Sequence, residues 1–260
     1  MPWVLRGLRE GVVTTPYPRR PDGYGESFRA AVSVHRQDAP AHGREIVELC
    51  PTGAIAIEDD TIFLHRDRCI LCGRCVAADP ARFAFEENPE TATIGRRPLV
   101  VPPGDGDEEG LVRLRRDLAR RVRAFRRSVH IRHVDAGSDG SEEWEVAALL
   151  NPVYDVQRLG IHFTASPRHA DMLLVTGAGS VGMAGPLRRT YEAMPHPKVV
   201  IAAGVDAASG GLAHPTYATT GGVEAHLPVD VYVPGSPPSP FSLLHGILLA
   251  IGLVETGATR

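Results

Sequence analysis

The chain has 260 residues, of which 43% are apolar, and it carries a formal net charge of −3 and four cysteines. This apolar content excludes a wholly disordered chain, and the small net charge gives no signal for nucleic-acid binding. Four cysteines are too few for a disulfide-stapled secreted scaffold. Residues 1–30 lack the charged, apolar and small-residue segments that follow one another in a signal peptide. The longest apolar stretch, residues 241–254, is too short to span a bilayer. We therefore expect a cytoplasmic protein whose cysteines have a role other than disulfide formation.

The first half of the chain divides into three predicted segments. Residues 1–30 are rich in proline, glycine and arginine and indicate an irregular extension. Residues 31–86 contain all four cysteines and a predicted hairpin, with strands at 54–57 and 61–64 around a turn. Residues 87–128 indicate a linker followed by an arginine-rich amphipathic helix at about 108–127. That helix either docks on a partner or an anionic membrane surface, or packs on its own domain with solvated arginines.

The second half, residues 129–260, alternates predicted strands and helices. The strands are expected at 129–134, 161–164, 172–176, 199–203 and 229–233, and the helices at 142–150, 182–194 and 241–255. Short apolar strands that alternate with helices favour a mostly parallel sheet covered on both faces. We therefore predict an α/β domain over residues 129–260.

The cysteines follow the spacing of iron–sulfur ligands. Cys69, Cys72 and Cys75 match the bacterial ferredoxin run C-x2-C-x2-C-x3-C-P, in which Asp79 replaces the last cysteine. Cys50 is followed by proline and matches the end of an earlier copy of the same run. Soft thiolates suit iron–sulfur clusters, whereas a structural zinc site usually pairs two C-x2-C units.

The missing cysteines form a coherent set. The first three ligand positions of the earlier copy hold Pro40, Gly43 and Ile46. In two-cluster ferredoxins the last cysteine of each run binds the cluster of the other run. One cluster would therefore need positions 40, 43, 46 and 79, where no cysteine remains. The other would need positions 50, 69, 72 and 75, which are all cysteine, so the spacing predicts one 4Fe–4S cluster on Cys50, Cys69, Cys72 and Cys75.

Four stretches of the second half form a specific set: RSVHIRHVDAGS at 127–138, NPVYD at 151–155, SPRHAD at 166–171 and VYVPG at 231–235. With these stretches, residues 127–255 resemble the small subunit of group 4 (energy-converting) nickel–iron hydrogenases and the homologous 20 kDa-type subunit of complex I. Residues 30–85 resemble the ferredoxin-like iron–sulfur subunits of the same complexes. The resemblance implies a fusion of an α+β ferredoxin-like module with a flavodoxin-like, doubly wound α/β domain.

The small-subunit family binds a 4Fe–4S cluster through four cysteines, and this chain departs from that pattern. The corresponding positions hold Asp139, Glu142, Asp206 and Ser236. The resemblance therefore implies that this second cluster has been lost. Two interpretations of the acidic replacements remain open: oxygen ligands suit magnesium, calcium or manganese, whereas buried like-charged carboxylates repel and indicate an emptied pocket.

The resemblance implies an iron–sulfur subunit, without catalytic residues of its own, of a membrane-associated complex I-like or energy-converting-hydrogenase-like (formate hydrogenlyase-like) oxidoreductase. Its single 4Fe–4S cluster would carry electrons. Its partners would be a hydrogenase-large-subunit-like protein and membrane subunits, which would place it peripherally on the inner face of the cell membrane. Two alternatives are an assembly adapter whose cluster is not a relay, and a carboxylate-bound metal site at the former cluster pocket.

One further motif competes with this interpretation. Gly177, Gly179 and Gly182 form G-x-G-x-x-G between a predicted strand and a predicted helix, as in dinucleotide-binding folds. The acidic residue that should contact a ribose about 20 residues later is missing until Asp206, which is already assigned to the former cluster. The sequence therefore favours a role for these glycines without a nucleotide.

Overall fold

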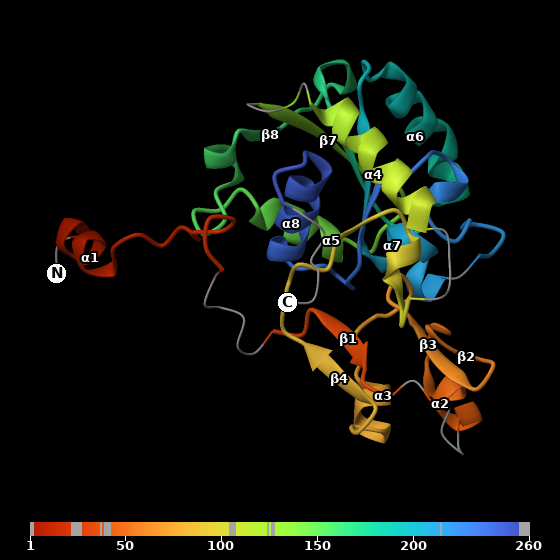
Figure 1. The fold of residues 1–260 in the computed structure, drawn as a ribbon. Coiled ribbons are helices and arrows are strands. Elements are labelled where there is room, and N and C mark those ends of the chain that lie inside the picture. The colour runs from red at the N-terminus through yellow and green to blue at the C-terminus, as the bar shows by residue number, and fades with distance from the viewer. Residues whose placement is uncertain are drawn as a thin grey trace.

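The computed structural model describes residues 3–21, 28–36, 38, 43–103, 108–123, 125, 128–213 and 215–254 (Figure 1). The described residues form a six-stranded, a three-stranded and a two-stranded sheet. In Figure 1 the two smaller sheets lie together below the large one. Among the described residues, no helix has the length and apolar content needed to cross a membrane.

The large sheet contains five parallel strands in the order β8-β7-β9-β10-β11, with β5 added antiparallel at the β11 edge. Numbered along the chain, the parallel strands follow the order 2-1-3-4-5, which recurs in doubly wound sheets. The strands are β5 (Thr93–Ile94), β7 (Val129–Asp135), β8 (Ile161–Phe163), β9 (Met172–Thr176), β10 (Val199–Ala203) and β11 (Val231–Val233). Every residue of β9, β10 and β11 is buried, which is why these strands are continuous apolar runs.

Helices cover the large sheet on both faces. One hydrophobic core joins the sheet to α4 (Glu108–Val122), α5 (Ser141–Ala148) and α8 (Pro240–Ala250). A second core joins the opposite face to α6 (Val181–Ala193) and α7 (Gly204–Ser209). The predicted mostly parallel sheet with covered faces is therefore confirmed.

The cysteine-bearing part is a separate module with its own core. In it, β1 (Ala31–Val34) pairs antiparallel with β4 (Phe83–Glu86), and β2 (Ile55–Glu58) forms the predicted hairpin with β3 (Thr61–His65). Two short helices, α2 (Gly43–Leu49) and α3 (Arg74–Ala78), complete it. Leu64, Ile62 and Phe83 are almost fully buried in its core.

The segment predicted as a linker connects the two parts more tightly than a linker would. Its strand β5 joins the large sheet beside β11, and β6 (Val100–Val101) joins the module beside β3. Short strands of two residues give no periodicity in the sequence, so this pairing could not be predicted. The linker is therefore structured and fixes the module against the α/β domain.

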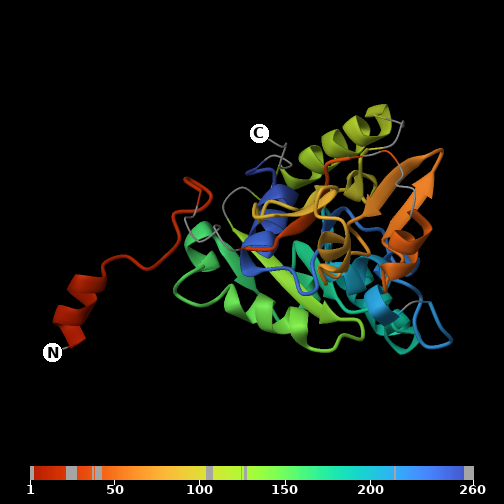
Figure 2. The same ribbon diagram turned by 90° about the horizontal axis from the view of Figure 1, so that it is seen from below.

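One helix that was not predicted and the ends of two predicted helices also differ from the expectation. The predicted irregular extension contains α1 (Trp3–Glu10), which buries no residue and projects away from the rest of the chain (Figures 1 and 2). Helix α4 ends at Val122, and residues 124, 126 and 127 of the predicted helix lie outside the described residues. Helix α8 ends at Ala250, because Gly252 takes a positive φ of 71° just after it.

Single turns of 3₁₀ helix lie at Arg97–Leu99, Val156–Leu159, Pro167–His169, Gly211–Ala213 and Val223–Ala225.

Candidate functional site

The four cysteines come from three adjacent elements of the module and line one pocket. Cys50 directly follows α2, Cys69 and Cys72 lie in the loop between β3 and α3, and Cys75 lies within α3. The remaining wall is largely apolar and includes Val32, Ile55 and Leu64. The structure therefore brings together the four residues that the spacing selected.

Backbone N–H groups point at the sulfur atoms of this pocket. The Ala54 N–H donates to Cys50 Sγ at 3.2 Å, and the N–H of Leu71 bonds the sulfur of Cys69. Leu71 reaches this position with a φ of 56°, in the left-handed region. Such hydrogen bonds to sulfur stabilise thiolates and help to set the potential of an iron–sulfur cluster.

Burial favours the protonated thiols of Cys69 and Cys75 when no metal is bound. It raises the pKa of Cys69 to about 12, and it also raises the pKa of Cys75. A metal that binds here must displace these protons, so its binding becomes stronger as the pH rises. Four sulfur donors in an apolar pocket with N–H donors fit an iron–sulfur cluster better than they fit a hard cation.

The positions of the second, cysteine-free ligand set in the module carry other interactions. Gly43 begins α2 and is buried, Ile46 belongs to the module core, and Asp79 follows α3. Asp79 forms an ion pair with the buried Arg82 at 3.1 Å. Pro40 lies outside the described residues.

At the carboxyl edge of the large sheet, the three carboxylates predicted to stand at family cluster positions lie near one another. Asp139 precedes α5, the buried Glu142 lies in its first turn, and Asp206 lies in α7. Glu142 packs against the backbone at Gly204, where a Cβ would lie only 2.5 Å from its Oε1. Burial, then the charge of Asp206, raises the pKa of Glu142 to about 7. The fourth position, Ser236, lies in the next loop, whose Gly235 carbonyl accepts a bond from Val205 N–H at 2.9 Å.

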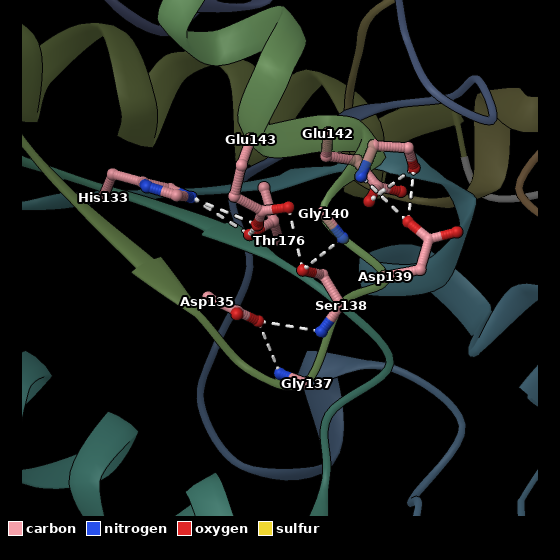
Figure 3. Close-up of polar contacts among 10 residues, drawn as sticks. His133, Asp135, Gly137, Ser138, Asp139, Gly140, Glu142, Glu143 and Thr176 are labelled. Carbon is pink, nitrogen blue, oxygen red and sulfur yellow. Dashed lines mark hydrogen bonds and ion pairs between the residues drawn. The ribbon is translucent and has the colours of Figure 1, made fainter.

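A polar network that the sequence did not reveal lies beside these carboxylates (Figure 3). Glu143 accepts hydrogen bonds from the Thr176 hydroxyl and, at 2.8 Å, from the Ser138 hydroxyl. His133 Nε2 lies 3.0 Å from Thr176 Oγ1. Burial lowers the pKa of His133, partly offset by the Glu143 charge. The one signal in the sequence was the place of Thr176 at the end of an apolar strand, where parallel sheets collect functional groups.

Two of the three glycines of G-x-G-x-x-G, Gly177 and Gly179, lie where backbone segments approach each other closely. A Cβ on Gly177 would lie 2.6 Å from the carbonyl carbon of Gly137, and one on Gly179 would lie 2.5 Å from the oxygen of Gly222. Two N–H groups of this segment are already bonded, with Ala178 N–H to Gly137 O and Ser180 N–H to Ala136 O. These contacts explain Gly177 and Gly179 without a nucleotide.

Two family models match the chain. The model "NADH ubiquinone oxidoreductase, 20 Kd subunit" matches residues 140–250, and the model "4Fe-4S single cluster domain" matches residues 62–120. The second match includes Cys69, Cys72 and Cys75 but begins after Cys50. A Pyrococcus furiosus protein named "Probable membrane-bound hydrogenase subunit mbhJ" is 39% identical over 139 residues, which cover 54% of this chain and 83% of that protein. The chain belongs to the 20 kDa subunit family.

Other hydrogenase and reductase subunits are also similar to this chain. "Formate hydrogenlyase subunit 7" of Escherichia coli is 39% identical over 148 residues, and the match covers 57% of this chain and 57% of that protein. The chain thus spans little more than half the length of this relative. Among solved structures, a chain of the archaeal membrane-bound sulfane sulfur reductase is 31% identical, with 54% of this chain and 77% of that chain covered and a TM-score of 0.45. The family models and the two sequence relatives confirm the predicted resemblance to hydrogenase and complex I subunits and the presence of a 4Fe–4S domain.

Proposed function

We propose that the chain is the iron–sulfur subunit of a membrane-associated oxidoreductase complex of the complex I and energy-converting-hydrogenase type. In this proposal it carries one 4Fe–4S cluster on Cys50, Cys69, Cys72 and Cys75. The cluster supplies single-electron transfer. The chain's own residues supply the thiolates, exclude water from the apolar wall and donate hydrogen bonds to sulfur.

The observation that carries the proposal is the convergence of all four cysteines on one pocket. The order of elements around it, β1-α2-β2-β3-α3-β4 with β1 beside β4, supports a ferredoxin-like module over residues 31–86. The match to a single-cluster 4Fe–4S model over residues 62–120 supports the same cofactor. We divide the chain accordingly into an extension at 1–30, the module, a structured connection with helix α4 at 87–128, and a flavodoxin-like α/β domain at 129–260.

The proposal includes the loss of two neighbouring clusters. In the module, Ile46 packs into the core and Asp79 is paired with Arg82, so these positions offer no thiolate. At the edge of the large sheet, Glu142 and Asp206 take the places of family cysteines, and burial raises the pKa of both carboxyl groups. A relay that passes through this domain in the family manner has no carrier here.

The alternative of a carboxylate-bound metal is less well supported. Within the described part of the chain, no three His, Cys, Asp or Glu side chains form a group that could hold a metal ion. The carboxyl groups instead bind hydroxyls, as Ser141 Oγ donates to Asp139 at 2.6 Å. For the cysteines, a cuboidal cluster spreads its four thiolates more widely than one ion does, and four thiols that line a shared pocket suit that arrangement.

We place the partner subunit at the carboxyl edge of the large sheet. Large apolar side chains are exposed there, with Trp144 at 78% and Tyr217 at 99% of their maximal accessible area, and Val181 and Leu212 are also exposed. Exposed aromatic residues of this kind are typical of protein interfaces. Relatives named as membrane-bound hydrogenase and formate hydrogenlyase subunits support membership of a membrane-associated complex. Within it we further propose a hydrogenase-large-subunit-like partner, membrane subunits and a peripheral position on the inner face of the cell membrane.

The test is a Cys50→Ser variant of the full chain, purified without oxygen in its complex. We expect the visible absorbance and the reducible paramagnetic signal of the cluster to disappear, although Cys50 lies outside the matched 4Fe–4S segment. The control is Thr52→Val, which removes a hydroxyl 3.6 Å from Cys50 Sγ and leaves all four thiols in place. An unchanged cluster in Cys50→Ser would refute the ligand assignment.

The same variant separates a relay from an adapter. If the cluster carries electrons, a complex that contains Cys50→Ser assembles but transfers no electrons. If the chain is an adapter with a structural cluster, the complex fails to assemble, and any complex that does form transfers electrons at the normal rate.

A further inference from the structure

A cavity of about 520 Å³ lies between the cysteine-bearing module and the α/β domain. One side is formed by Leu71 of the cysteine loop and by the segment 28–30 that leads into β1. The other side is formed by α5 and by the proline-rich loop 234–240 that follows β11. The cavity thus spans from the loop that contains Cys72 to the loop that contains Ser236.

The lining is mostly apolar, with a few polar groups. Phe28, Leu71, Ala148 and four prolines of the loop provide apolar surface. Arg29 provides a cation, and its guanidinium is held over the Phe85 ring at 4.6 Å from the centroid. Arg29 is exposed to solvent, and the Phe85 ring holds its guanidinium at this edge of the module.

A second polar group of the lining is Glu145. Burial raises its pKa, so its carboxyl group retains a proton more readily than an exposed one and can then donate a hydrogen bond. The cavity therefore combines the Arg29 cation and the Glu145 carboxyl group with an apolar wall. This combination favours a ligand that brings an anionic or accepting group together with an apolar body.

We propose that this cavity binds a small, ring-bearing and mainly apolar molecule whose single anionic group faces Arg29. Its volume lies within the roughly 300–1,000 Å³ of small-molecule sites, which occur preferentially between domains and combine apolar walls with a few polar groups. The prolines of the loop 234–240 give a rigid wall that suits a flat ring. Binding does not depend on the proposed cluster, because no cysteine lines the cavity.

The ligand would nevertheless influence the cluster through Leu71. This residue lines the cavity with other atoms while its N–H bonds the Cys69 sulfur, so the two sites share one wall. An anion that binds on the cavity side opposes the addition of an electron on the cluster side. Occupation of the cavity is therefore expected to lower the reduction potential of the cluster.

The probe is 1-anilinonaphthalene-8-sulfonate, which combines flat rings with one sulfonate, titrated into the complete holo chain and followed by its fluorescence. We expect saturable binding at one site per chain. Ala148→Phe fills the cavity from α5, and we expect it to weaken binding by at least about tenfold. The matched control is Ala147→Phe on the exposed side of the same helix, which should leave the affinity unchanged.

A second variant keeps the cavity open and tests the charge. Arg29→Gln should weaken the sulfonate probe severalfold and leave the binding of neutral 1-anilinonaphthalene unchanged. Unaltered probe affinity in both Ala148→Phe and Arg29→Gln, or no saturable binding to the folded chain, would overturn the proposal. Binding to a cluster-free Cys72→Ser chain separates the outcomes: probe binding there supports the cavity site even if the cluster assignment fails.

Discussion

Glu142 offers the sharpest test of the carboxylate pocket. Its side chain is buried beside Asp206 and Asp139, and these surroundings raise its pKa from 4.5 to about 7. Between these two values the folded chain binds more protons than the unfolded chain. The stability that proton binding at Glu142 gives the folded chain is therefore fully present below pH 4.5 and is lost as the pH rises through 7.

The magnitude follows from the two pKa values. With a pKa of 4.5 in the unfolded chain and about 7 in the folded chain, the contribution of Glu142 to the free energy of unfolding falls by about 2.5 kcal/mol between pH 5 and pH 8. Glu142→Gln removes this ionisation and keeps the size of the side chain. We expect the variant to gain about 2.5 kcal/mol relative to the wild type between pH 5 and pH 8, which is a shift of about 5–10 °C in Tm for a chain of this size.

The assay is thermal unfolding of the wild type and the variant at several pH values, with one heating rate and no oxygen. The control is Glu109→Gln, which removes an exposed carboxylate at the start of α4. A Tm difference between Glu142→Gln and the wild type that stays the same from pH 5 to pH 8 would contradict the reasoning. The same conclusion would follow if Glu109→Gln showed an equal pH dependence.

Two further predictions concern the scaffold. Asp230 is buried, forms an ion pair with Arg121 and accepts a hydrogen bond from the Val200 N–H at 2.9 Å. Asp230→Asn should therefore lower the free energy of unfolding by about 2 kcal/mol or more. The control is Asp117→Asn, whose side chain is 49% exposed and which should change this free energy by less than about 0.5 kcal/mol. Gly179 has a φ of 69° and no room for a Cβ, so Gly179→Ala should cost more than about 2 kcal/mol, whereas Gly182→Ala in α6 should be neutral or gain up to about 1 kcal/mol. Denaturant unfolding measures each pair, and equal effects within a pair would contradict the structural reason given.

The sequence predicted the α/β domain well because its strands are buried on both faces. A strand such as β10 has no exposed side and therefore consists of apolar residues only, which a sequence displays directly. Helix α7 escaped prediction because it is a short segment of small residues without an amphipathic pattern. The extent of the predicted linker was also misjudged, since β5 and β6 are defined by their partners in other parts of the chain.

The candidate site likewise contains residues that the sequence could predict and residues that it could not. The four cysteines could be selected from spacing, because ligand spacing in a loop reflects the geometry of the group it binds. The resemblance to the small-subunit family, and not the spacing itself, predicted that Asp139, Glu142 and Asp206 lie together. The network of His133, Thr176 and Glu143 could not be predicted, since it depends on which side chains face each other across neighbouring strands and a helix.

The central claim is that all four cysteines bind one 4Fe–4S cluster and that the two neighbouring cluster positions are empty. The most direct measurement is the iron and sulfide content per chain of protein purified without oxygen, together with a reductive titration followed by electron paramagnetic resonance. We expect about four irons per chain and a single reducible centre. About eight irons, two reducible centres, or zinc in place of iron would contradict it.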